Sequence, residues 1–207
     1  MAEKSGRSVG RREMLLKAAA EVFFEQGYAS TSIDAIIERA GGSKRNIYNE
    51  FGSKEGLFAA IVRSSADSAL SSLSQEQIEG RGLEETLTAF GQHLMEIYMS
   101  PTVVSVYRIA INEANRFPDL ARSFYEQGPG RAASQLAEVL EFAAQRGEIE
   151  PRDYSRAAGL FVGMIRDNLH LQVVLGLRSP PLEPEVRRIV SSAVDIFLNG
   201  VRLQAGK

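Results

Sequence analysis

The sequence predicts an all-α fold of about nine helices, and three observations indicate it. Apolar residues recur at helical spacing in almost every segment, whereas no segment shows the sustained alternation of a half-buried strand. Glycine or proline lies near most of the expected helix ends. With 44% apolar and 24% charged residues in 207, the composition is that of a globular protein with a sizeable core.

The first helix is expected over residues 11–26, where the apolar residues form one stripe and Gly27 can end the helix in a left-handed conformation. Residues 1–9 precede it. This segment carries basic side chains without an apolar run, and we expect a flexible basic arm. Thr31, with Asp34 three residues later, resembles a capping box and predicts the start of a second, short helix.

The second helix is stopped by Gly41 and Gly42, and a third helix over residues 44–50 follows at once. The Ser43 hydroxyl can cap this third helix, and a glycine at position 52 can break it. A long fourth helix, opened by Ser53, is expected to run to about residue 73.

The remaining helices are punctuated by proline, and a polar stretch with two glycines at 71–82 is the best candidate for a domain boundary. We therefore divide the chain into an N-terminal domain over 10–70 and a second domain over 71–207. Its helices are expected at about 83–99, 102–115, 118–146 with an interruption near 128–130, 153–176 and 183–203.

Several classes of function are disfavoured by composition. No cysteine occurs, and the two histidines lack metal-ligand spacing, so we expect no metal site and no cofactor. No nucleophile with a partner base and no phosphate loop is visible, which argues against an enzyme. No apolar run is long enough for a membrane span, and we expect a cytoplasmic protein. The net charge of −2 excludes a uniformly basic surface, but basic residues gather near 1–12 and 44–54.

The order helix, helix, turn and helix predicts a helix-turn-helix motif at about 31–50, whose last helix enters the major groove of DNA. Ile47 and Phe51, four residues apart, are expected to face the core. Arg45 suits guanine and Asn49 suits adenine, whereas the other polar side chains suit phosphate or sugar. The predicted DNA contacts are Thr31, Ser43, Lys44, Arg45, Asn46, Tyr48, Asn49 and Lys54.

The run TSIDAIIERAGGSKRNIYNEFGSKEGLF at 31–58 resembles the DNA-binding domain of the TetR/AcrR family of bacterial transcriptional regulators. The resemblance covers roughly residues 10–62. Three residues depart from the family pattern. Gly42 replaces a valine at the turn, Ile37 replaces an alanine, and Glu50 replaces a histidine or tyrosine that commonly meets a phosphate. A carboxylate there is repelled by DNA unless it turns away or accepts from cytosine, so Glu50 is left off the predicted contacts.

The run RIAINEANRFPDLARSFYEQGPGR at 108–131 resembles the AefR-like branch of the family. The resemblance implies a ligand cavity among the middle helices and a dimer interface formed mainly by the last two. Polar residues embedded in apolar helices are the candidates for the cavity, although each can equally belong to an internal pair or the dimer seam. The candidate effector-binding residues are Met95, Met99, Tyr107, Arg108, Asn112, Phe161, Met164 and Asn168.

The helix expected at 153–176 is apolar on more than one side and therefore needs more than one packing partner, which favours a subunit interface over a purely internal core. Gly159 and Gly163 would permit close helix approach. The candidate interface residues are Phe161, Ile165, Leu169, Val173, Ile189, Val190, Val194 and Phe197.

Together these observations predict a homodimeric regulator of transcription that binds double-stranded operator DNA and is released by a small hydrophobic effector, most simply a repressor. An activator, or a regulator without a ligand, fits the same residues. A more distant alternative is an all-α small-molecule-binding protein or enzyme with an incidental helix-turn-helix motif.

Overall fold

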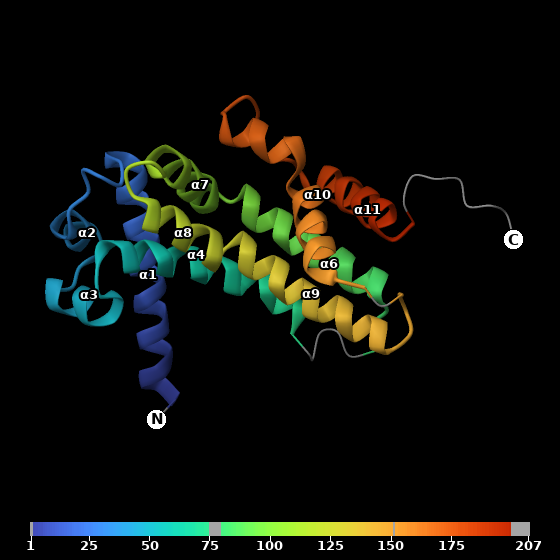
Figure 1. Ribbon diagram of the computed structural model, residues 1–207. Helices are drawn as coiled ribbons and strands as arrows, with labels where there is room; N and C mark the ends of the chain where they lie inside the picture. The colour runs from blue at the N-terminus through green and yellow to red at the C-terminus, as the bar shows by residue number, and fades with distance from the viewer. Residues whose placement is uncertain (1, 75–79, 151, 200–207) are drawn as a thin grey trace, which may run out of the picture. The chain divides into compact units, whose positions relative to one another are not determined.

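The computed structural model describes residues 2–74, 80–150 and 152–199, with side chains from residue 10 onward in these ranges. Every regular element in the described part of the chain is a helix, which confirms the predicted fold class (Figure 1). None of the helices in these ranges is long and apolar enough to cross a membrane. The chain divides into two compact units, residues 1–65 with 101–128 and residues 66–100 with 129–207.

This division differs from the predicted boundary at 71–82, because residues 101–128 belong with the N-terminal helices. The physical reason is a shared core: Val106, Ile109 and Leu120 are buried in the same cluster as the aromatic residues of the N-terminal segment. The sequence predicted each helix correctly in outline, but not which helices pack together.

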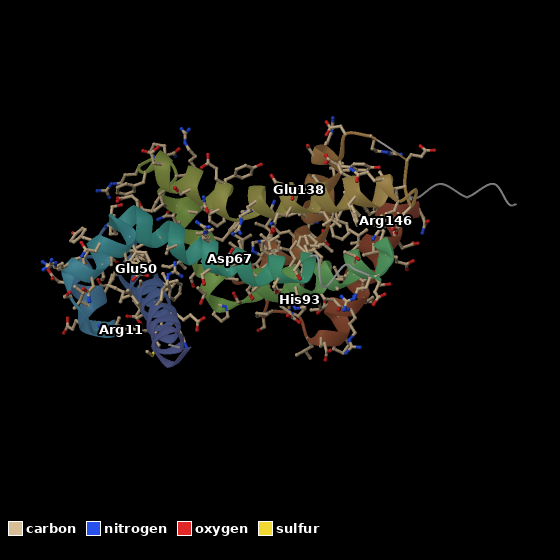
Figure 2. All side chains as sticks on the ribbon, turned by 90° about the horizontal axis from the view of Figure 1, so that it is seen from below. Arg11, Glu50, Asp67, His93, Glu138 and Arg146 are labelled. Atoms are coloured by element: carbon tan, nitrogen blue, oxygen red, sulfur yellow. The ribbon has the colours of Figure 1, made fainter. Side chains whose placement is uncertain are left out.

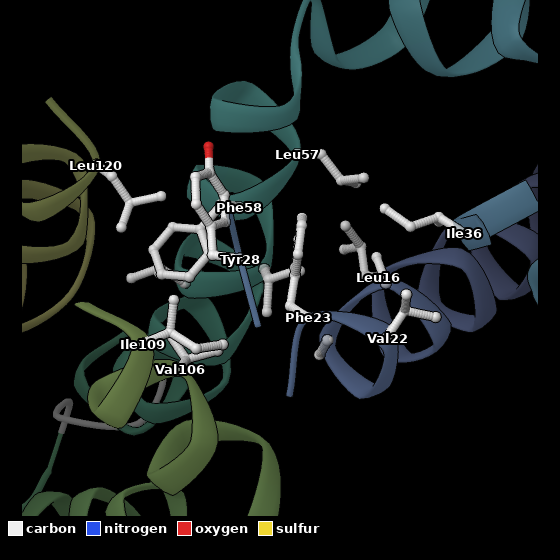
Figure 3. Close-up of a cluster of buried hydrophobic side chains, with 14 of the residues drawn as sticks. Leu16, Val22, Phe23, Tyr28, Ile36, Leu57, Phe58, Val106, Ile109 and Leu120 are labelled. Atoms are coloured by element: carbon white, nitrogen blue, oxygen red, sulfur yellow. The ribbon is translucent and has the colours of Figure 1, made fainter. Parts of the chain in front are cut away.

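The first unit is centred on three aromatic rings (Figure 3). Phe23, Tyr28 and Phe58 have ring centroids 5.2 to 6.2 Å apart, the separation at which tilted and edge-to-face pairs are favourable. The helices of this unit are α1 Ala2–Gln26, α2 Ile33–Ala40, α3 Lys44–Phe51, the larger part of α4 Lys54–Leu70, α7 Pro101–Glu113 and α8 Pro118–Gln127.

The helix ends follow local chemistry, with two differences from expectation. Helix α1 begins at Ala2, so the segment predicted as a flexible arm has a helical backbone. Helix α2 is capped by Ser32, whose Oγ accepts from the Ala35 amide at 3.1 Å, and not by Thr31. Thr31 is buried, and its hydroxyl donates to the carbonyl of Gly27 at 2.8 Å. It is therefore part of the α1–α2 connection.

The second unit has a separate core. The Phe161 ring lies 6.3 Å from Phe90 and 5.0 Å from Phe197. Gly91 of α6 allows its two partner helices to approach, because a Cβ there would lie 2.8 Å from Val190 Cγ1 and 3.0 Å from Ile165 Cδ1. The helices are the C-terminal end of α4, η1 Ser71–Leu73, α6 Leu83–Met99, α9 Pro129–Gln145, α10 Tyr154–Val174 and α11 Glu183–Asn199.

The candidate interface residues lie mainly inside this core. Six of the eight are buried within a single chain, and only Ile189 and Phe197 are partly exposed. The six are Phe161, Ile165, Leu169, Val173, Val190 and Val194, and their contribution to a subunit interface stays a prediction. The outward apolar residues of the same helices are Leu160, Leu171 and Ile196.

The candidate effector-binding residues are divided between the units. Met95, Met99 and Phe161 are buried in the second unit, where Met164 is partly buried and Asn168 is exposed. The other three lie on α7 in the first unit: Tyr107 and Arg108 are half-buried and Asn112 is exposed. Their gathering around one ligand stays a prediction. A pocket of about 260 Å³ in the second unit includes none of the eight; it is lined by Leu83, Leu140, Ile149, Glu150, Arg152, Tyr154, Ala157, Phe197 and Leu198.

Candidate nucleic-acid interface

The turn between α2 and α3 depends on two glycines. Gly41 has φ of 73° and Gly42 has φ of 113°, a region that side chains other than glycine rarely adopt. The second value explains the departure noted at position 42: a valine there would be strained by the backbone, although a Cβ would meet only Arg11 Nη2 at an ordinary 3.7 Å. Ser43 then caps α3 as predicted, its Oγ accepting from the Asn46 amide at 3.2 Å.

Helix α3 is held from one side and exposed on the others. Ile47 is 2% exposed in the core, and Phe51 packs partly against the same cluster. The remaining side chains of the helix, Lys44, Arg45, Asn46, Tyr48, Asn49 and Glu50, are all exposed. The predicted orientation is thus confirmed for Ile47, and a short polar helix surface is presented to solvent.

The two cations at the start of α3 differ in their partners. Lys44 Nζ forms an ion pair with Asp34 Oδ2 of α2 at 2.8 Å, and this hydrogen bond raises the pKa of Lys44. Both side chains are more than half exposed, so the pair is weak and can yield to a phosphate. Arg45 is exposed and has no ion pair among the described residues.

Lys54 lies elsewhere than the sequence predicted. Its ammonium donates to the carbonyls of Tyr28 at 2.8 Å, Thr31 at 3.0 Å and Ala29 at 3.4 Å, and it lies 4.5 Å from the centroid of the Tyr28 ring. Burial lowers its pKa. All three ammonium protons are directed to the loop after α1, so Lys54 joins α4 to that loop instead of pointing at a phosphate. Contact of Lys54 or of the buried Thr31 with DNA stays a prediction.

A cleft of about 430 Å³ separates α3 from the N-terminal half of α1. Arg12 crosses it: its Nε lies 3.0 Å from Glu50 Oε1, and its guanidinium carbon lies 5.7 Å from the centroid of the Phe51 ring. Figure 2 labels Arg11 on α1 and Glu50 near the same helix. The cleft is lined by Arg11, Arg12, Leu15, Ala40, Gly41, Gly42, Ser43, Asn46, Ile47, Asn49 and Glu50.

A short capped helix with a polar outer surface, following a tight turn, is the arrangement of a helix-turn-helix motif. We call the motif formed by α2, the turn and α3 the reading head, and α3 its recognition helix. Residues 15–61 match the family described as "Bacterial regulatory proteins, tetR family". Residues 85–200, more than half of the chain, match "AefR-like transcriptional repressor, C-terminal domain". The chain belongs to the TetR family. It is a DNA-binding transcriptional regulator, and the proteins it resembles are regulators and not enzymes, as predicted.

Individual TetR-family relatives match over different lengths. The HTH-type transcriptional activator FasR of Mycolicibacterium smegmatis is 42% identical over 65 residues, which cover 31% of this chain and 30% of FasR. The structure of "Flavonoid-responsive Regulator FrrA" is 35% identical, has a TM-score of 0.70, and covers 91% of this chain and 95% of its own. A regulator from Mesorhizobium loti MAFF303099 is 27% identical with a TM-score of 0.75, covering 93% and 96%.

Within this TetR-family reading head the predicted contacts now fall into distinct groups. Arg45 and Tyr48 are exposed outside the cleft, whereas Asn46 and Asn49 line it. The sequence did not single out the ion pair between Arg12 and Glu50. The sequence does contain both partners, since a basic pair lies just before the apolar stripe of α1 and a carboxylate lies at an unusual position in α3. Whether these residues meet depends on how α1 crosses α3, which the sequence alone does not give.

Proposed function

We propose that this TetR-family regulator binds as a homodimer to a pseudo-palindromic operator, represses transcription there, and is released by a small hydrophobic effector. Each α3 would enter the major groove of one half-site, with the two half-sites about 34 to 36 Å apart. The observation that carries the DNA-reading part is the exposed polar surface of α3, anchored from behind by Ile47.

Base reading is assigned to the exposed side chains that can form two hydrogen bonds to one base. Arg45 suits the O6 and N7 atoms of guanine, and Asn49 suits the N6 and N7 atoms of adenine. Lys44 and Tyr48 suit phosphate or sugar, which fixes the register of the helix on DNA. Ser43 acts through the capping bond to the Asn46 amide.

Titration of labelled operator DNA at several salt concentrations tests this assignment. Specific binding should weaken steeply with salt, because bound phosphates release counterions. Arg45→Ala should cost about 1 to 3 kcal/mol on the operator and relax base preference at one position. Arg122→Ala, an exposed arginine of α8, is the matched control and should bind as wild type. An equal loss on every DNA sequence would make Arg45 a phosphate contact, and salt-independent binding would refute the reading head.

Dimerisation is assigned to the outer surfaces of α10 and α11. Leu160 is 58% exposed, Leu171 51% and Ile196 41%, and apolar side chains of this size on an exposed surface can be covered by a second copy. In the part of α10 before its kink at Asp167, a Cβ added to Gly159 or Gly163 would meet nothing within 4 Å, so a second helix can approach closely there. The AefR-like match covers both helices.

Sedimentation analysis of charged variants tests the dimer. Leu160→Glu and Leu171→Glu should each give monomers, because a carboxylate in the interface is left without a partner. Tyr125→Glu, at a 64% exposed position on α8, is the control and should leave the mass unchanged. If both leucine variants remain dimeric, the interface lies elsewhere.

Effector binding is assigned to the second unit. Its helices hold the predicted apolar residues Met95, Met99 and Phe161. The resemblance to the flavonoid-responsive regulator FrrA favours a flat aromatic compound. A thermal-shift screen with flavonoids, followed by operator titration, tests this. A true effector raises Tm and weakens operator binding, since release requires different affinities for the two states. A compound that only raises Tm is a ligand without regulatory effect.

The repressor assignment has one specific competitor. FasR is described as an activator, but its match covers only 31% of this chain, whereas the repressor-type match covers residues 85–200. Transcription in vitro from a promoter that carries the operator separates the two. Repression predicts less transcript with the protein and recovery with the effector; an increase on adding the protein would establish an activator.

A further inference from the structure

Glu50 is held by α1 and not directed at solvent alone. Its Oε1 lies 3.0 Å from Arg12 Nε, and the neighbouring Phe51 ring lies 5.7 Å from the carbon of the same guanidinium. Two successive residues of the recognition helix therefore fix one arginine of α1. A carboxylate that reads cytosine needs an oxygen free to accept from the base, and here one oxygen is already paired.

The pair contributes little to folding stability, but it neutralises the positive charge of Arg12. Both side chains are 43% exposed, and exposed ion pairs contribute little to folding. The cleft that they cross is lined by a second arginine, Arg11, which has no ion pair among the described residues. Of two adjacent cations on α1, one is neutralised by the recognition helix and the other is left available.

We propose that Glu50 limits the affinity of the regulator for DNA by acting through Arg12: the ion pair withholds one cation per protomer from the DNA phosphates. Phosphate contacts strengthen binding to every sequence, whereas base contacts distinguish sequences. Withholding Arg12 therefore weakens binding to every duplex, the operator included, while leaving Arg45 and Asn49 free to read bases. This inference rests on the proposed reading head and explains why a carboxylate is tolerated at a surface that faces DNA.

The test uses the full-length protein with operator DNA and with an unrelated duplex of equal length, titrated at several salt concentrations. Glu50→Gln keeps the shape of the side chain and removes its charge. Because each phosphate contact adds about 0.9 to the salt slope, one released arginine should raise affinity for unrelated DNA roughly five- to tenfold per protomer near 0.1 M salt. Affinity for the operator should rise by a similar factor, because a phosphate contact is independent of sequence, so the ratio of the two affinities should stay near the wild-type value.

Two further variants identify the cation and the mechanism. In Arg12→Gln/Glu50→Gln the salt slope should return to the wild-type value, because the released arginine is gone. Glu38→Gln removes an exposed carboxylate of α2 that has no described ion pair, and should leave the slope unchanged. Unfolding midpoints of all variants should match wild type, since the pair is exposed.

Three results would overturn the proposal. In the first, Glu50→Gln leaves the salt slope unaltered, which would show that no cation is withheld. The same variant could instead lose affinity at a single base pair, which would make Glu50 a base reader. In the second, the double variant stays as steep as Glu50→Gln, which would exclude Arg12. In the third, Glu38→Gln steepens the slope equally, which would indicate general repulsion. Failure of the wild-type protein to bind DNA would instead refute the proposed function, so the two failures are distinguishable.

Discussion

Lys54→Met separates two roles for one lysine, the structural role seen in its hydrogen bonds and the phosphate contact expected from the sequence. Methionine keeps much of the apolar stem, and with it the contact with Tyr28, but it removes the ammonium. Two carbonyl oxygens, those of Tyr28 at 2.8 Å and Thr31 at 3.0 Å, then lose a charged donor. The Ala29 carbonyl, at 3.4 Å, loses a weaker one.

The magnitude follows from these distances. A hydrogen bond to a charged group contributes about 1.5 to 3 kcal/mol, so two good bonds set an upper range of about 3 to 6 kcal/mol. Lys54 is only partly buried, and the lowering of its pKa by burial shows that desolvation opposes the bonds. Water also reaches part of the site. We therefore expect Lys54→Met to lower the free energy of unfolding by about 2 to 3 kcal/mol.

Urea unfolding followed by far-ultraviolet circular dichroism measures this loss. At an m-value of about 2 kcal/mol/M, the midpoint of the first unit should fall by about 1 M. Lys17→Met, an exposed lysine of α1, is the matched control and should stay within about 0.5 kcal/mol of wild type. The structural reasoning is refuted if Lys54→Met is as stable as the control and instead loses about 0.9 per protomer from the salt slope on DNA.

Two other perturbations test the packing of each unit. In the first unit, Gly56→Ala places a Cβ 1.9 Å from the Phe51 carbonyl oxygen, and the backbone cannot yield there. We therefore expect the free energy of unfolding to fall by about 3 kcal/mol or more, measured by urea unfolding. We also expect α3 to be displaced, which operator binding would detect. Gly10→Ala, where a Cβ meets nothing, is its control and should be neutral or stabilising; equal behaviour of the two variants would contradict the clash. In the second unit, burial first and the positive charge of Arg166 second lower the pKa of His170 from 6.5 to about 4. The unfolded chain therefore binds a proton that the folded chain does not between these pH values, and stability should fall by about 1 to 3 kcal/mol as pH drops from 6.5 to 4. His170→Gln should flatten this part of the stability profile, and an unchanged slope would show that His170 does not titrate as described.

Sequence predicted the helices well because their ends are decided locally. Gly27, Gly41 and Gly52 all have positive φ, which glycine alone adopts without strain, and each follows the last turn of a helix. The cap of α2 was assigned one residue early, to Thr31, because two adjacent hydroxyls can both cap. Only the burial of Thr31 against the Gly27 carbonyl decides in favour of Ser32.

The face of α10 that packs inward was not decided by its sequence. Leu160 and Phe161 are both large and apolar, yet Leu160 is 58% exposed and Phe161 is fully buried. The choice depends on the neighbouring helices, since Phe90 of α6 and Phe197 of α11 both pack on Phe161. A helix that is apolar on several sides shows that it has several partners, but not which side meets which partner.

The charges around α3 lead to a consistent expectation for the reading head. Lys54 bonds to carbonyls, Arg12 pairs with Glu50 and Lys44 pairs with Asp34, so among the described cations near α3 two arginines, Arg11 and Arg45, are without such partners. In the proposed dimer, Arg11 and Lys44 bring four cations to the DNA phosphates, since the exposed pair of Lys44 with Asp34 can yield, while Arg45 reads a base. The wild-type salt slope should then lie near about −4. It would approach about −5 if Lys54 also met a phosphate. A shallow slope leaves little affinity for unrelated DNA, so discrimination must come mainly from base contacts, as the pairing of Glu50 with Arg12 implies.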